Sequence, residues 1–175
     1  LDTFLGSTNK IYNGIPNYIK SDMDKSRFGS ILVDKIARSI IEAPINRFFL
    51  DRIIYKGKIL LLKDFIIPLS SDETKIGYSK EQINWALQNE EYIWKYFIGN
   101  DLLFKTDDDL IDRFIIPAPF SKFYLEIDNE SPGKIGQWIG WQILRSFRKK
   151  NSTLKISDIL NLSSEELFKK ANYKP

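Results

Sequence analysis

The side chains that could perform chemistry in this sequence are carboxylates, lysines, hydroxyls and tryptophans, because its 175 residues include no histidine and no cysteine. Histidine is the commonest general base and, together with cysteine, the usual zinc ligand. Its absence excludes every catalytic triad that depends on histidine. We therefore predict that the chain binds no zinc and no other cofactor, since carboxylates alone favour harder ions such as Ca²⁺ and Mg²⁺.

Three acidic residues, Glu126, Asp128 and Glu130, alternate in a segment predicted to be loop or extended chain. Alternate side chains of an extended backbone point the same way, so these carboxylates could hold Ca²⁺, which takes several oxygen ligands. Their spacing does not fit an EF-hand, and acids in a loop are usually just solvated. Many acids could form the carboxylate pair of a glycoside hydrolase, but the sequence singles out no pair.

The segment from Ser131 to Phe147 predicts an almost wholly apolar helix that contains Gly136 and Gly140, with Ser131 as its N-cap. Each interior glycine costs about 1 kcal/mol relative to alanine, so something must approach this face closely. We predict that the helix is the spine of the domain and packs against the helix at residues 45–67. A ligand groove and a partner protein are the two alternatives.

Trp138 and Trp141 lie in the same predicted helix. Packing in or near the core is the favoured interpretation. Rings that stack on a sugar or a peptide are the alternative.

Apolar residues at helical spacing predict the elements that position these side chains. One helix spans residues 22–42, a second 44–67 and a third 79–97, with short helices near residues 100–104, 107–117, 156–160 and 163–170. The apolar residues at steps of four in the first helix are Phe28, Leu32, Ile36 and Ile40, and the inward set of the third is Ile83, Leu87, Trp94 and Phe97. Residues 68–78 are predicted to be a polar loop.

The fold class is therefore mostly α, with one domain over residues 1–175 and no convincing pair of strands. Hydrophobic residues make up 43% of the chain, which is typical of a globular protein. The net charge of +3 is spread among acids and bases, with no basic stripe or nucleic-acid-binding motif. No apolar run is long enough to span a bilayer.

The stretch "IPAPFSKFYLEIDNESPGKIGQWIGWQILRSF", residues 116–147, closely resembles the gliding motility lipoprotein GldB family of Bacteroidetes. "LDTFLG", "YNGIPNYI" and "IIYKGKILLLKDFIIP" extend the resemblance over the whole chain, which corresponds to about the C-terminal half of a typical member. The resemblance implies a lipid-anchored protein of the cell envelope, on the periplasmic side or at the outer membrane. It also implies a role in gliding and type IX secretion, envelope proteins of that machinery as partners, and no established enzymatic activity.

A more distant resemblance is to predicted zincin-type proteases, in which one helix carries HExxH and the next contributes a glutamate. On that frame "DKIAR" occupies the HExxH position, so Asp34 and Arg38 stand where the two histidines would be and Lys35 replaces the glutamate base. Lys56 stands near the expected glutamate ligand. The resemblance implies a degenerate zincin-like helical core in which Asp34 and Arg38 form an ion pair in place of the metal and are substantially buried, with Lys56 or Glu42 nearby.

The function predicted from the sequence is a non-catalytic interaction module of the motility and secretion machinery. A hydrolase that uses carboxylates or retains a vestigial zincin site is one alternative. A module that binds peptides or glycans through Trp138 and Trp141 is the other.

Overall fold

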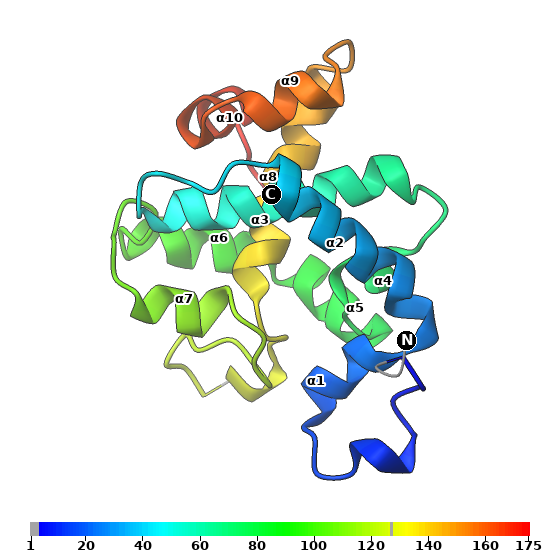
Figure 1. The fold of residues 1–175 in the computed structure, drawn as a ribbon. Coiled ribbons are helices and arrows are strands. Elements are labelled where there is room, and N and C mark those ends of the chain that lie inside the picture. The colour runs from blue at the N-terminus through cyan, green and yellow to red at the C-terminus, as the bar shows by residue number, and fades with distance from the viewer. Residues whose placement is uncertain (1–3, 127) are drawn as a thin grey trace.

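The computed structural model describes residues 4–126 and 128–175, which form one domain of α-helices and short 3-10 helices without a β-strand (Figure 1). This confirms the mostly α fold class. The α-helices are α1 (Asn17–Lys20), α2 (Phe28–Ile40), α3 (Phe49–Ile66), α4 (Asp72–Ile76), α5 (Lys80–Gln88), α6 (Glu90–Gly99), α7 (Asp109–Phe114), α8 (Ile135–Lys150), α9 (Ile156–Asn161) and α10 (Ser164–Ala171). No described helix is both long enough and apolar enough to cross a bilayer.

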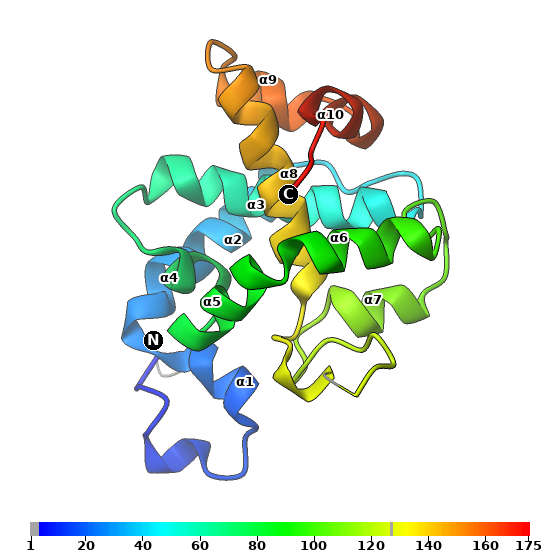
Figure 2. The same cartoon turned by 180° about the vertical axis from the view of Figure 1, so that it is seen from behind.

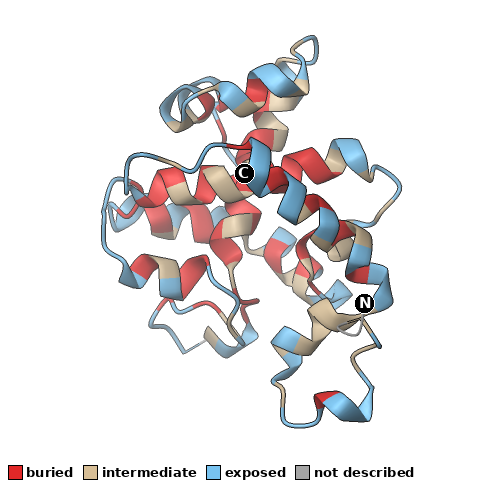
Figure 3. Cartoon of the chain, viewed as in Figure 1, coloured by how far each residue is buried: buried red, intermediate tan, exposed pale blue. Residues whose placement is uncertain are grey.

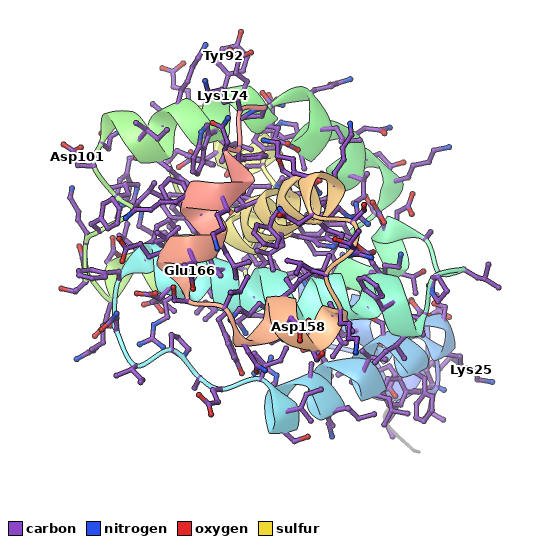
Figure 4. All side chains as sticks on the ribbon, turned by 90° about the horizontal axis from the view of Figure 1, so that it is seen from above. Lys25, Tyr92, Asp101, Asp158, Glu166 and Lys174 are labelled. Carbon is purple, nitrogen blue, oxygen red and sulfur yellow. The ribbon has the colours of Figure 1, made fainter. Side chains whose placement is uncertain are left out.

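Helices α3 and α8 cross at the centre of the molecule and make the most extensive contact between any two helices (Figures 1 and 2). Both are apolar around most of their circumference, which is typical of central helices. Figure 3 shows buried residues concentrated along these two helices and α6. In Figure 4, by contrast, the labelled Lys25, Tyr92 and Asp101 lie at the rim of the molecule.

Glycines allow the two backbones to touch where α3 and α8 cross. An ideal Cβ on Gly140 would overlap the carbonyl oxygen of Ile53, and one on Gly57 would overlap the carbonyl oxygen of Gly140. Gly136, one turn earlier, faces the carbonyl oxygen of Phe114 at 2.9 Å from an ideal Cβ. The prediction that the glycine-bearing helix is the spine, packed against the helix at 45–67, is confirmed.

The N-terminus of α8 differs from the prediction. Ser131 is not its N-cap, because the helix begins at Ile135 after Lys134, which adopts a left-handed conformation with φ of 54°. The Ser131 hydroxyl instead donates to the carbonyl oxygens of Ser121 and Asp128. The turn before α8 therefore belongs to the loop that follows α7, and its geometry places Lys134 outside the regular helix.

Other elements also differ from the prediction, and the helix predicted from residue 44 begins only at Phe49. The helix predicted at 79–97 is interrupted at Asn89, so α5 and α6 are separate and Leu87 is exposed. Residues 100–104 form turns, and α4 lies within the predicted polar loop. The first helix begins only at Phe28, and its residues Phe28, Leu32, Ile36 and Ile40 are exposed, while Val33 and Ala37 face the core.

A capping box begins α5. The Ser79 hydroxyl accepts a hydrogen bond from the Gln82 amide at 3.2 Å, and the Gln82 side chain accepts one from the Ser79 amide at 2.9 Å. These two bonds satisfy backbone donors that the first turn of a helix leaves free.

Candidate functional site

A cavity of about 430 Å³ lies between α2, α3 and the N-terminus of α8, and it contains all three residues that the protease-like frame singles out. Asp34 and Arg38 line it from α2, and Lys56 lines it from α3. The remaining lining residues are Asp22, Arg27, Ile31, Lys35, Leu60, Lys63, Ile76, Pro117, Lys134 and Gln137. Six basic side chains thus face two carboxylates, which leaves four formal positive charges in excess.

Asp34 is the central anion of this cavity. Its carboxylate pairs with Arg38 at 3.2 Å and with Lys63 at 2.5 Å. Burial would raise the pKa of Asp34, but the two cations outweigh that effect and hold the pKa below its usual value. Asp34 is consequently an ionised partner of Lys63 and is poorly suited to donate a proton as a general acid.

The predicted burial of the Asp34–Arg38 pair is wrong for Arg38, whose side chain is 51% exposed, while that of Asp34 is 28% exposed. Of the two residues predicted nearby, Lys56 lines this cavity and Glu42 lines a different one. The buried cation is Lys63, whose side chain is only 3% exposed and whose ammonium also donates to the Lys75 carbonyl oxygen at 2.8 Å. Burial lowers the pKa of Lys63 even though Asp34 opposes the change.

Two substitutions separate the roles of these cations. Asp34→Ala leaves Lys63 buried without its carboxylate and should lower the free energy of unfolding by about 2 kcal/mol, the cost of an unsatisfied buried group. Arg38→Ala removes an exposed i,i+4 pair and should cost less than about 0.5 kcal/mol. Urea denaturation of the two variants measures both values, and equal midpoints would contradict this assignment of partners.

Lys56 and Lys134 contrast with Lys63 because neither ammonium group forms a hydrogen bond or an ion pair with a described residue. The Lys134 nitrogen lies 5.7 Å from the centroid of the Tyr78 ring. Desolvation by burial lowers the pKa of Lys56 and lowers that of Lys134 to about 8. The Asp34–Lys63 ion pair acts electrostatically on both ammonium groups. The cavity thus holds two partly buried lysines whose charge is not compensated by a direct partner, in addition to the exposed Lys35.

The lowered pKa of Lys134 predicts a pH dependence of stability. Between about pH 8 and 10.5, the ordinary pKa of a lysine, the unfolded chain retains a proton on this residue that the folded chain has lost, so stability rises with pH across this window. Asp22 and Asp34 oppose the shift, and Arg27 and Lys63 increase it. The urea midpoints of the parent and of Lys134→Met are measured from pH 7 to 10. The difference between the two midpoints should become smaller as the pH rises, and a constant difference would contradict the prediction.

The other acidic candidates do not converge. Asp128 lies in a 3-10 helix, and its carboxylate accepts hydrogen bonds from the backbone amides of Phe123 and Tyr124 at 3.0 and 2.8 Å. Glu126 and Glu130 are exposed. Within residues 4–126 and 128–175, no three acidic side chains are grouped so that they could share a metal ion. The Asp128 carboxylate therefore caps local backbone, which explains its presence without a cation.

Trp138 and Trp141 are fully buried, as the favoured interpretation predicted. Their indole N–H groups donate to Glu90 and Asp64, each at 2.9 Å. Neither ring is available to stack on a sugar or peptide in this structure.

A second polar cluster, which the sequence analysis missed, holds α3, α4 and α8 together. Asp64 accepts hydrogen bonds from Lys75, Trp141 and Arg145, and the Arg145 guanidinium also binds Asp72 at 2.6 and 2.7 Å. The guanidinium carbon lies 3.7 Å from the centroid of the Trp141 ring. The i,i+4 spacing of Trp141 and Arg145 was a signal for this contact.

Lys63 and Lys134 were also missed, for different reasons. Lys63 lies seven residues after Lys56, two helical turns on, so helical spacing alone could have placed both on one face of α3. Lys134 lies within the helix predicted from Ser131 to Phe147, but it precedes the observed helix. Its left-handed backbone turns it toward the cavity, and no periodic pattern predicts such a residue.

Comparison with known proteins gives one match. A family model described as "Gliding motility protein GldB" covers residues 1–175. No curated protein and no solved structure matches the chain. The predicted similarity to zincin-type proteases has no support from these comparisons and stays a prediction.

Proposed function

Because this chain belongs to the gliding motility protein GldB family, which gives it a role in gliding motility, we propose that it acts there as a non-catalytic binding module of the cell envelope. The family is one of lipoproteins, so the module would be held at the membrane by a lipid anchor rather than by a helix of this domain. Its partners would be envelope proteins of the gliding and type IX secretion machinery.

The chemistry of the cationic cavity is the observation that carries the non-catalytic part of the proposal. Its two carboxylates are both ion-paired, Asp22 with Arg27 and Asp34 with Lys63. The rest of its polar lining consists of bases and one amide, Gln137, whose nitrogen donates to the Ile115 carbonyl oxygen. Such a set can bind and orient an anionic group, but it contains no free carboxylate to serve as base or nucleophile.

The second candidate function is a degenerate hydrolase of the zincin type. One observation favours it: Asp34, Arg38 and Lys56, the residues at the former ligand positions on that frame, line a single cavity. Under this interpretation Lys63 and Arg38 take the place of the metal charge beside Asp34. The cavity would then be an ancestral active site that has been reused for binding.

A motility assay tests the binding role. The full-length gene in a gliding bacterium is replaced by a version that encodes Lys56→Met and Lys134→Met, and colony spreading and protein abundance are measured. We expect loss of spreading with unchanged abundance. The matched control is Lys169→Met, which removes an exposed lysine paired with Glu165 and should leave spreading intact. Normal spreading of the double variant would overturn the assignment of the binding role to this cavity.

A further inference from the structure

The basic side chains of the cationic cavity outnumber the carboxylates that could neutralise them. Lys63, Arg38 and Arg27 each have a carboxylate partner, and those carboxylates are Asp34 and Asp22. Three lysines remain without a direct partner among the described residues. Lys35 is exposed, whereas Lys56 and Lys134 are both partly withdrawn from solvent. Holding unpaired cations in such a place is costly, and an anion between them would relieve that cost.

Asp34 does not serve as the carboxylate partner of Lys56 or Lys134. The Asp34 carboxylate already accepts from Lys63 and Arg38, and Lys63 completes its bonds at the Lys75 carbonyl oxygen. Asp34 is thus paired with these two cations and forms no ion pair with Lys56 or Lys134. Lys56 and Lys134 line the same cavity as this ion pair, which acts electrostatically on both ammonium groups.

The backbone at Lys134 is a further observation. A non-glycine residue with φ of 54° adopts a conformation that is unfavourable for L-amino acids, and glycine would adopt it freely. A lysine here directs its ammonium group to the cavity, whereas the adjacent Gly133 contributes only backbone to the neighbouring lining.

We propose that this cavity is an oxyanion-binding site in which Lys56 and Lys134 hold a carboxylate or phosphate group. The group would belong to a larger molecule, because Arg27 also lines an adjoining open groove of about 670 Å³ and Lys134 lines a small pocket that joins the two. The proposal rests on the proposed function only in treating this cavity as the binding site, and anion binding by the purified chain tests it without reference to motility.

The experiment is a titration of the chain of residues 1–175 with inorganic phosphate and, separately, with glutarate. Ionic strength is held constant with sodium chloride, and both calorimetry and the melting temperature are recorded at pH 7. We expect saturable binding of at least one probe, with a rise in melting temperature. Preference for phosphate or for glutarate distinguishes a phosphorylated ligand from a carboxylate one, and either supports the site.

Variants locate the binding. Lys56→Met and Lys134→Gly should each weaken the affinity about tenfold or more, the effect expected for loss of a charged hydrogen bond. Lys134→Gly should melt at or above the parent temperature because glycine suits the left-handed backbone. Lys169→Met should bind as the parent does. Binding that does not saturate, or that persists in both cavity variants, would overturn the proposal. Saturable binding by the parent together with normal spreading of the double variant would overturn only the proposed function.

Discussion

Gly140→Leu is expected to prevent the chain from reaching its native fold. The obstacle to the new side chain is the carbonyl oxygen of Ile53, a backbone atom in the middle of α3 that cannot move without breaking the helix. Overpacking of ordinary core sites costs about 1–3 kcal/mol because side chains can readjust, and here they cannot. The cost should therefore approach the total stability of a domain, about 5–15 kcal/mol.

Circular dichroism and urea denaturation of the purified variant measure this effect. Gly29→Ala is the matched control, because Gly29 also lies in a helix but an added Cβ would meet no atom within 4 Å. That variant should gain about 0.5–1 kcal/mol, since alanine favours helix and restricts the unfolded chain. A Gly140→Leu protein that melts within a degree or two of the parent would show that the crossing of α3 and α8 is not as close as described.

The second large effect is expected for Asp64→Asn. Asp64 is 19% exposed and accepts two hydrogen bonds from Arg145, one from Lys75 and one from Trp141, all at 2.8–2.9 Å. The neutral amide cannot compensate these cations, and it turns a donor toward them. Removal of one partner from such a cluster typically costs about 3–5 kcal/mol, and we expect the variant to lie in that range.

The same cluster makes stability dependent on acid. Burial would raise the pKa of Asp64, but Arg145 and Lys75 outweigh it and lower the pKa in the folded state. A lowered folded pKa gives stability that is present above the ordinary carboxyl range and is lost as the pH falls through the folded value. Urea midpoints from pH 7 to pH 2 should therefore fall more steeply for the parent than for Asp64→Asn.

The control for Asp64 is Glu165→Gln on α10, which breaks a fully exposed pair with Lys169. Its midpoint should equal that of the parent. If Asp64→Asn also left the midpoint unchanged, the cluster would contribute no more than a surface ion pair, and its role in joining α3, α4 and α8 would be refuted.

The sequence predicted the helical class and the central crossing because both follow from local rules. Glycines inside an otherwise apolar helix have few physical explanations. Gly136 and Gly140 led to the correct one, the close approach of a neighbouring backbone. Element boundaries were less predictable. The apolar residues Leu32 and Ile36 follow a helical period, yet they are exposed, since periodicity identifies a face without saying whether a neighbour covers it.

The candidate site was predicted in part. The resemblance pointed to Asp34, Arg38 and Lys56, and these do share a cavity. It did not indicate Lys63, which makes the buried contact with Asp34, nor Lys134, whose placement depends on a turn. Which residues on different helices form ion pairs depends on how the helices cross. The local patterns of a single sequence do not predict that geometry.

The crossing of α3 and α8 also determines when this protein can fold. Gly57 and Gly140 are 83 positions apart, and closing a loop of that length costs about 4 kcal/mol of chain entropy before the contact returns any stability. During synthesis the face of α3 that packs against α8 stays exposed until α8 has been made. Helices α4 to α7 belong to the loop that has not yet closed. Folding is thus a late, long-range event, and slow relative to helical proteins whose neighbouring helices pack in sequence order.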